Sequence, residues 1–235
     1  MWPRIPRRYR PTFTCTATRS QTVTRLPLFP LGLVLFPGIS LPLHLFEPRY
    51  RQLLSDVQGS DGRFGIVCAI PEVPETDLPA GRVGCVAEVT AVEAFEDGRS
   101  NITVIGRERF ALTRIDDQAA PYLLADVELV EDVEASSVIA LSILADEVRS
   151  KFGRVVTAIH VLSDQGALPV PVLADEPSGL PWSIASMINM GLEQRQRLLE
   201  ERSAMARVEQ MDALLRSVLP DVELRAAMHG RSAEP

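Results

Sequence analysis

The stretch LPLFPLGLVLFPGISLPLHLFEPRYRQLLSDV, residues 26–57, decides how the N-terminal half of this chain folds. Its first part consists mainly of Leu, Ile, Val and Phe, but it also contains Pro27, Pro30, Pro37 and Pro42. Because proline has no N–H and a restricted φ angle, this apolar run cannot be a helix and is predicted to form short strands. The Pro37-Gly38 pair predicts a turn between two of them.

A short helix is predicted directly after these strands. Pro48 stands where a first-turn proline is tolerated, and Tyr50, Leu53, Leu54 and Val57 follow at helical spacing. One face of this helix should therefore pack on the strands.

The next part of the chain, up to residue 130, is predicted to be further strands. The segments FGIVCAI (64–70), GRVGCVAEVTAVEAF (81–95), NITVIGRERFALTRI (101–115) and PYLLADVELV (121–130) are apolar or alternating. Asp97-Gly98 predicts a hairpin turn, and Gly106 predicts a bulge or bend. Many short strands with tight turns indicate a strongly curled sheet or a partly closed barrel.

Helices are predicted beyond residue 131. Apolar residues recur in steps of three and four from Val138 to Leu162, which predicts one long amphipathic helix that ends before Gly166 and Pro169. A proline-rich break leads to a second helical block from Trp182, which Pro220 is predicted to close. The expected organisation is a flexible basic leader (1–25), a β-rich unit (26–130), a helical unit (131–220) and a flexible tail (221–235), in the α+β class.

The charges are unevenly distributed. Residues 1–46 contain six arginines and no acidic residue, so with a net charge of −7 the remainder carries −7 − 6 = −13. An acidic body disfavours nucleic acid as a partner, because proteins bind its phosphates mainly through Lys and Arg.

No run of 18 residues is apolar and free of charge and proline, so no membrane span is expected. Cys15, Cys68 and Cys85 form no CxxC, which favours a reducing, cytoplasmic location.

The strand-rich opening also carries a resemblance. LPLFPLGLVLFPG followed by LPLHLFEPRYRQLL resembles the start of the Lon substrate-binding domain, the N-terminal module of Lon proteases. The resemblance continues through AEV, EDGR, GRERFAL and PYLLADVELVED to WSIASMINMGLEQRQRLLEERSAMARVEQMDALL. It implies a PUA-like β pseudo-barrel followed by an α-helical bundle, and a role in recognising unfolded or degron-bearing polypeptides.

The catalytic parts of Lon proteases are not found in this sequence. There is no G-x-x-x-x-G-K-[ST] loop, and Lys151, the only lysine, lies in a charged helical stretch that resembles no peptidase motif. There is no GxSxG elbow, and three histidines without HExxH or CxxC favour neither a catalytic base nor a metal site. We therefore predict a stand-alone, non-catalytic form of the family that needs no cofactor.

Two apolar clusters are candidate binding sites for polypeptide. One is the loop with Leu33, Phe36 and Pro37, and the other is the start of the second helical block with Trp182, Met187 and Met190. The competing interpretation is that these side chains fill the interface between the two units.

Glu47, Pro48, Arg49 and Tyr50 are interpreted as a structural anchor for the short helix. The expected partners are client polypeptides and an ATP-dependent protease that would receive them from this protein as adaptor. The alternative function is a small-molecule sensor with a pocket in the β-rich unit and His44 or Tyr50 at its rim.

Overall fold

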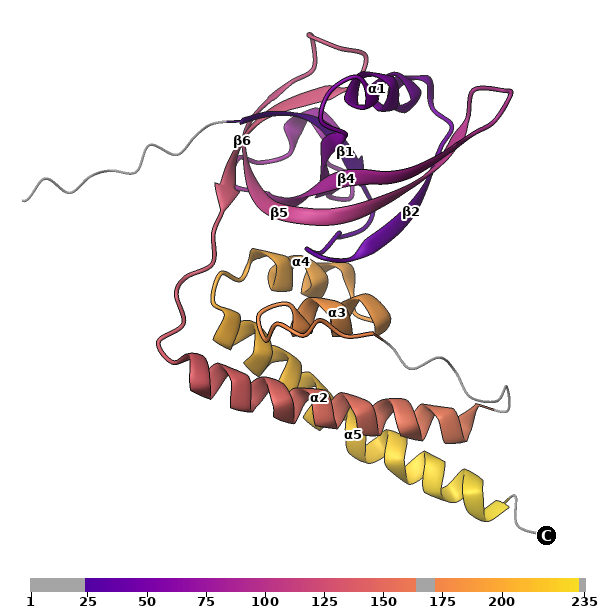
Figure 1. The fold of residues 1–235 in the computed structure, drawn as a ribbon, viewed down its shortest axis with the longest axis vertical. Helices are drawn as coiled ribbons and strands as arrows, with labels where there is room; N and C mark the ends of the chain where they lie inside the picture. Colours follow the sequence, from indigo (N-terminus) through magenta and orange to yellow (C-terminus); the bar gives the residue numbers. More distant parts are fainter. Residues whose placement is uncertain (1–23, 164–171, 233–235) are drawn as a thin grey trace, which may run out of the picture.

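A computed structural model describes residues 24–163 and 172–232, and it consists of a β half and a helical half (Figure 1). Nearly all of the predicted leader, the predicted helix end at Gly166 and Pro169, and the last residues of the predicted tail lie outside the described residues. The β half comprises residues 24–130, and the helical half comprises residues 138–232.

Six strands build the β half: β1 (Thr24–Leu31), β2 (Ser40–Leu45), β3 (Arg63–Cys68), β4 (Val83–Ala94), β5 (Ser100–Asp116) and β6 (Leu123–Val130). They form one sheet in the order β2-β5-β4-β3-β1-β6. An additional β5–β6 pairing closes β1, β3, β4, β5 and β6 into a barrel, with β2 attached to β5. All pairs are antiparallel except β1–β3, which is parallel. The α+β class and the pseudo-barrel are thereby confirmed.

The parallel pair requires a crossover from β1 to β3, and β2 with α1 (Pro48–Gln58) provides it. Pro48 lies in the first turn of α1, as predicted. The buried face of α1 consists of Tyr50, Leu53, Leu54 and Val57, which join the barrel interior. This helix therefore covers one end of the barrel (Figure 1).

Both glycines singled out in the strands have a structural reason. Gly98 has φ +82° in the β4–β5 hairpin, a conformation that L-residues with side chains rarely adopt. The register of β4 against β5 shifts between Cys85 and Ala87, and Gly106 lies at this irregularity. A Cβ atom on Gly106 would lie 2.1 Å from the Phe36 carbonyl oxygen, so only glycine fits there.

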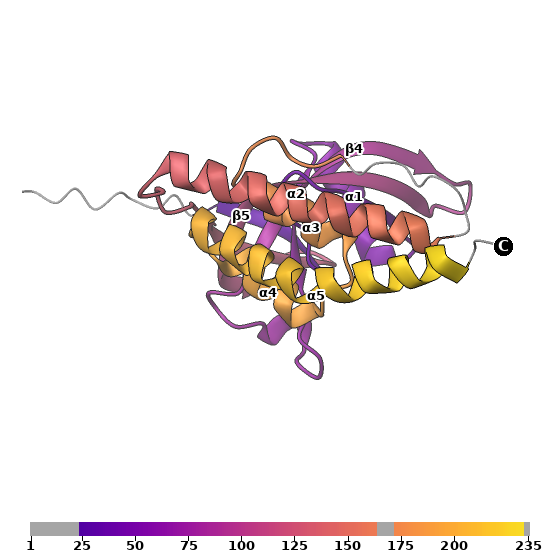
Figure 2. The same ribbon diagram turned by 90° about the horizontal axis from the view of Figure 1, so that it is seen from below.

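The helical half contains α2 (Val138–Leu162), α3 (Leu180–Met187), α4 (Leu192–Glu200) and α5 (Ala204–Ser232). The Ala140 N–H donates to Ser137 Oγ (3.2 Å) and caps the start of α2. The long helix predicted from Val138 to Leu162 is confirmed, whereas the second block is divided into three helices. Helices α2 and α5 lie side by side in both views (Figures 1 and 2).

The prediction that Pro220 ends the last helix is wrong, and so is a tail that begins at residue 221, because α5 continues to Ser232. Proline removes a single backbone donor, and contacts on both sides of it maintain the helix. Leu219 is buried in the helical core, and Arg154 of α2 forms an ion pair with Glu223 of α5 at 2.7 Å. Packing against α2 therefore outweighs the tendency of Pro220 to break a helix.

One apolar cluster joins the two halves. Val34, Phe36, Cys68 and Val83 of the β half pack with Trp182 and other side chains of the helical half. Two further clusters fill the barrel itself. Within the part of the chain that the structure describes, no helix is long and apolar enough to cross a lipid bilayer.

Candidate polypeptide-binding groove

Two of the six residues predicted to bind polypeptide are buried between the halves. Phe36 is 1% exposed and Trp182 is 9% exposed, and both belong to the cluster that joins the β half to the helical half. The tertiary structure therefore brings the two predicted segments together, but it uses these two aromatic rings as interface. A client polypeptide cannot reach them in this structure.

Charged side chains surround Trp182 at this junction. The guanidinium carbon of Arg207 lies 4.4 Å from the indole ring centre, and that of Arg109 lies 5.6 Å away. Both arginines donate to the carboxylate of Asp132, which lies in the connection between the halves. Arg109 also donates to the carbonyls of Leu199 (2.6 Å) and Glu201 (2.7 Å). Burial lowers the pKa of the Arg109 guanidinium. This cluster ties β5, the connection and the end of α4 together.

The other four predicted residues have different surroundings. Leu33 is partly buried against the cluster inside the barrel, and Pro37 is half-buried in its turn. Met187 is 43% exposed at the end of α3. Met190, in the short connection before α4, is half-buried and lines a hollow on the surface. Of the six, Met190 is thus the residue that lies in a concave site.

The residues proposed as an anchor surround the start of α1. Glu47 is the N-cap residue of α1, although its side chain makes no capping hydrogen bond, and Pro48 follows it. Arg49 donates to the carboxylates of Glu47 (2.9 Å) and Glu75 (2.6 Å), and these bonds raise its pKa. Tyr50 is 4% exposed and packs on Phe29 with ring centres 3.9 Å apart. Burial raises the pKa of the Tyr50 phenol. These contacts support the anchor interpretation, which stays a prediction.

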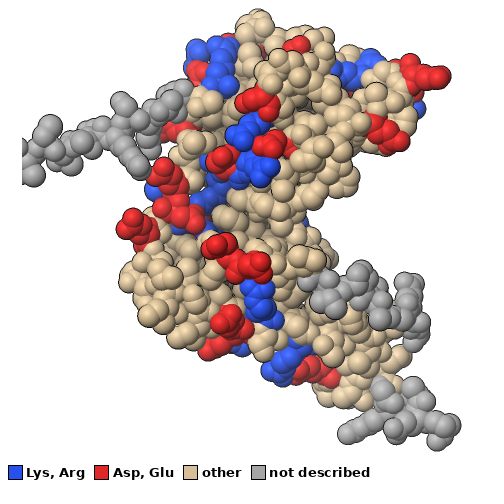
Figure 3. Space-filling model, viewed as in Figure 1, with Lys and Arg blue, Asp and Glu red and all other residues tan. Residues whose placement is uncertain are grey.

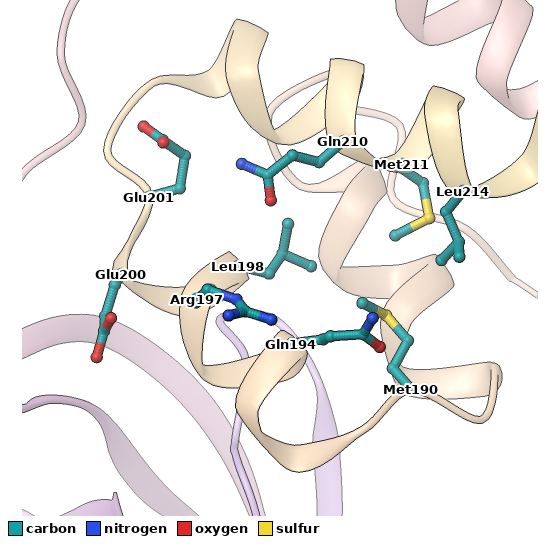
Figure 4. Close-up of a pocket in the computed structure, with 9 residues that line it drawn as sticks. All are labelled: Met190, Gln194, Arg197, Leu198, Glu200, Glu201, Gln210, Met211 and Leu214. Atoms are coloured by element: carbon teal, nitrogen blue, oxygen red, sulfur yellow. The ribbon is translucent and has the colours of Figure 1, made fainter.

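The hollow that contains Met190 lies between α4 and α5 and has a volume of about 590 Å³. We call it the α4–α5 groove (Figure 4). It is lined by Met190, Gln194, Arg197, Leu198, Glu200, Glu201, Gln210, Met211 and Leu214. Pocket volumes of this size accommodate a few side chains of a ligand. Of these residues, Met190 is the one predicted from the sequence to bind polypeptide.

The groove has a polarity along its length. Met190, Met211 and Leu214 gather at one end, whereas Glu200 and Glu201 lie at the other (Figure 4). Gln194 of α4 and Gln210 of α5 lie on its two opposite sides, between these ends. On the face shown in Figure 3, acidic and basic side chains are interspersed, and several of both signs lie where the two halves meet.

Two of the polar residues considered for chemistry, Lys151 and His44, lie in separate contacts far apart in the fold. Lys151 pairs with Asp212 at 2.8 Å and with Glu147 at 3.2 Å, which raises its pKa and connects α2 to α5. His44 Nδ1 lies 2.8 Å from Asn101 Oδ1 on the exposed side of the sheet. In the described parts of the chain, no group of three or more His, Cys, Asp or Glu residues is arranged to hold a metal ion.

The family model of the ATP-dependent protease La (LON) substrate-binding domain matches residues 25–217, which cover nearly all of the β half and most of the helical half. This chain belongs to the Lon substrate-binding domain family. "Lon protease 2" of Syntrophobacter fumaroxidans is 29% identical over 210 residues, which is 88% of this chain and 26% of that protease. "Lon protease" of Cytophaga hutchinsonii is 23% identical over 211 residues, which is 87% of this chain and 25% of that protease. The chain thus spans about a quarter of the length of these relatives.

Two solved structures share the Lon N-terminal fold. The Lon N-terminal domain protein from Xanthomonas campestris is similar with a TM-score of 0.59 and 24% identity, covering 81% of this chain and 98% of that one. The N-terminal domain of the Mycobacterium avium complex Lon protease has a TM-score of 0.60 and 16% identity, covering 82% of this chain and 98% of that one. At this identity the likeness establishes the fold alone.

Proposed function

We propose that this Lon-family domain binds unfolded or degron-bearing polypeptides and catalyses no reaction on them. Membership of a substrate-binding family supports a role in recognising substrates. The observation that carries the proposal is the α4–α5 groove, because it is a concave, methionine-lined surface in the helical half. Methionine is unbranched and polarizable, so it adapts to apolar side chains of different shapes.

A pull-down with one model protein in two states tests this function. The client is prepared folded, and also permanently unfolded by reduction and alkylation of its cysteines. We expect the full chain to retain the unfolded form and not the folded one. Retention of neither form, or of both equally, would refute recognition of unfolded polypeptide. Incubation with casein, with and without ATP, should leave the casein intact.

The adaptor role is a further part of the proposal. An adaptor must bind its client and also a protease, so this chain would present polypeptides to an ATP-dependent protease in the cytoplasm. Adding the purified chain to such a protease and an unfolded client should accelerate degradation of that client. An unchanged rate at saturating concentrations of the chain would leave binding without delivery.

A second candidate function rests on another hollow, of about 590 Å³, beside β2, β4 and β5. It is lined by residues that include His44, Glu93 and Asn101. The Asn101 amide donates to Glu93 (3.0 Å), and the Asn101 Oδ1 lies 2.8 Å from the His44 Nδ1. Tyr50 is buried and does not line this hollow. A metabolite that raises the melting temperature of the chain, but not of His44→Ala, would support a small-molecule sensor.

A further inference from the structure

We propose that the α4–α5 groove selects client segments in which an apolar side chain and a Lys or Arg lie about four or five residues apart. This inference rests on the proposed function, because it assigns the kind of polypeptide that the groove takes. It follows from the polarity of the groove, with an apolar end and an acidic end separated by the side chains of Gln194, Gln210, Leu198 and Arg197 (Figure 4).

The apolar end would take an aliphatic or aromatic side chain of the client. Met211 is 1% exposed and belongs to the helical core, while Met190 and Leu214 are half-buried beside it. A side chain inserted there would cover apolar surface that water now contacts, which favours binding. The two methionines can adjust to its shape, so this end would discriminate apolar from polar residues without choosing one apolar residue.

The acidic end would take a cationic side chain. Glu200 accepts a hydrogen bond from Gln196 (2.7 Å), and Glu201 accepts one from the backbone N–H of Ser203 (2.7 Å). Each of these bonds uses one carboxylate oxygen, so both groups keep a second oxygen for a ligand. The nearby Arg197 is already paired with Glu193 at 3.1 Å. The two carboxylates point in different directions (Figure 4), so a Lys or Arg of the client would meet one or the other of them, whereas an Asp or Glu would be repelled.

Between the two ends, the glutamine side chains suit an extended backbone. The Gln210 side chain is exposed, and its amide lies at the groove (Figure 4). Gln194 accepts a bond from the Gly191 N–H (3.3 Å) through its oxygen, which leaves its NH₂ group for a ligand. An amide side chain offers both a donor and an acceptor, as each peptide group does. Contacts of this kind recognise backbone irrespective of sequence, which fits a polypeptide better than a small molecule.

The spacing follows from helix geometry. The two ends are separated by the first turns of α5, about ten residues, which correspond to roughly 15 Å at 1.5 Å per residue. An extended chain rises about 3.3 Å per residue, so four or five client residues cover this distance. A client segment with its apolar and basic residues adjacent would reach only one end.

Fluorescence anisotropy with four labelled peptides tests the inference. The reference peptide carries Leu and Arg four positions apart in a Gly/Ser background, and the others replace Leu by Ser, replace Arg by Glu, or place Leu beside Arg. We expect each change to weaken binding to the full chain at least about fivefold. Equal affinity for all four peptides would overturn the proposed selectivity.

Protein variants locate the binding site. Leu214→Asp should weaken binding of the reference peptide at least about tenfold, and Gln210→Ala, on an exposed side chain, tests the groove without disturbing the core. Glu200→Gln with Glu201→Gln should abolish the preference for Arg over Glu at that peptide position. The matched control is Ile139→Asp in α2, because Ile139 is 75% exposed and lies outside the groove. Loss of binding in Ile139→Asp, with unchanged groove variants, would place the client on α2.

The two proposals fail in different ways. If unfolded client proteins bind and the groove variants leave that binding unchanged, the groove assignment is wrong and the function stands. If the wild-type chain retains no unfolded client in the pull-down, the proposed function itself is wrong.

Discussion

The two halves of this protein are stabilised by different means. In the β half, a closed ladder of backbone hydrogen bonds surrounds apolar side chains, and α1 covers one end. In the helical half, ion pairs such as Lys151–Asp212 and Arg154–Glu223 supplement the apolar contact between two long helices. The hollow of the β half lies on the strands β2, β4 and β5, whereas the α4–α5 groove lies between separate helices and is lined by methionine side chains. Because methionine adapts to varied apolar side chains, the candidate client site is placed in the helical half.

The halves are nevertheless joined by more than the connecting chain. Phe36 of the β half is buried in the same cluster as Trp182 of the helical half. Asp132 lies between them and receives hydrogen bonds from Arg109 of β5 and Arg207 of α5. We therefore expect damage at this junction to destabilise the whole described structure.

The largest effect is expected for Phe36→Ala. Removing a fully buried aromatic ring leaves a cavity at the junction, and the free energy of unfolding should fall by about 4 kcal/mol. Urea denaturation measures this, with Phe46→Ala as control, because Phe46 is 60% exposed. If Phe36→Ala reduced client binding without lowering the free energy of unfolding, Phe36 would be a binding residue. It would then have to be exposed when the protein binds a client.

The next effect is expected for Asp132→Asn. This change leaves Arg109 and Arg207, which are 3% and 0% exposed, without a carboxylate partner. The free energy of unfolding should fall by about 3 kcal/mol. This is the lower end of the loss found when one partner of a buried ion pair is removed, because water can reach the partly exposed Asp132. Glu134→Gln, on an exposed side chain two residues away, is the control and should change stability little. Similar denaturation midpoints for both variants would show that the junction depends on apolar contact alone.

A gain in stability is expected for Pro220→Ala. Alanine restores the backbone donor inside α5 and has the higher helix propensity, at the cost of a more flexible unfolded chain. The net gain should be about 2 kcal/mol at most, and hydrogen exchange of residues 221–229 should become slower. Pro181→Ala, in the first turn of α3, provides a proline control at a tolerated position. Faster exchange in Pro220→Ala would contradict a continuous α5.

The smallest expected effect is a loss of stability at alkaline pH, caused by Tyr122 in the β half. Burial and the hydrogen bond to Asp56 raise the pKa of Tyr122 to about 12 from its usual value near 10. Between these values the unfolded chain has released the tyrosine proton while the folded chain retains it. The stabilisation is therefore complete below pH 10 and is lost as the pH rises toward 12.

The measurement is the free energy of unfolding from pH 9 to pH 12 in wild type and Tyr122→Phe. The variant should show a shallower decline, although some decline remains because burial also raises the pKa of Cys85 to about 12. Identical slopes in the two proteins would exclude Tyr122 as a source of the pH dependence.

Much of the fold could be predicted because short stretches of sequence specify many of its strands, turns and helices. Prolines excluded helix from residues 26–46, and Gly98 marked the hairpin. The steps of three and four from Val138 to Leu162 predicted a helix over the residues that α2 occupies. Such features depend on backbone geometry and on the burial of one face, so a short stretch of sequence contains most of the information.

The groove could not be predicted, because it depends on two breaks inside one apparently helical block. Gly191 precedes α4, and Ser203, whose Oγ accepts a hydrogen bond from the Ala206 N–H (3.2 Å), precedes α5. A serine followed by helix formers is a possible start signal, but it is common and was not singled out. The apolar stripe of α5 is widened by Leu214, which lies beside Met211 and Leu215. This wider stripe is a sequence signal that α5 has an additional contact surface.

The sequence alone determined the α+β class, the proline-interrupted strands, the long α2 helix and the resemblance to the Lon substrate-binding family. Only the tertiary structure decided that Phe36 and Trp182 are interior, that α5 continues past Pro220, and that α4 and α5 enclose a groove. The physical reason is that local patterns specify which face of an element is apolar, while the partner that covers this face is chosen by packing between residues far apart in the chain.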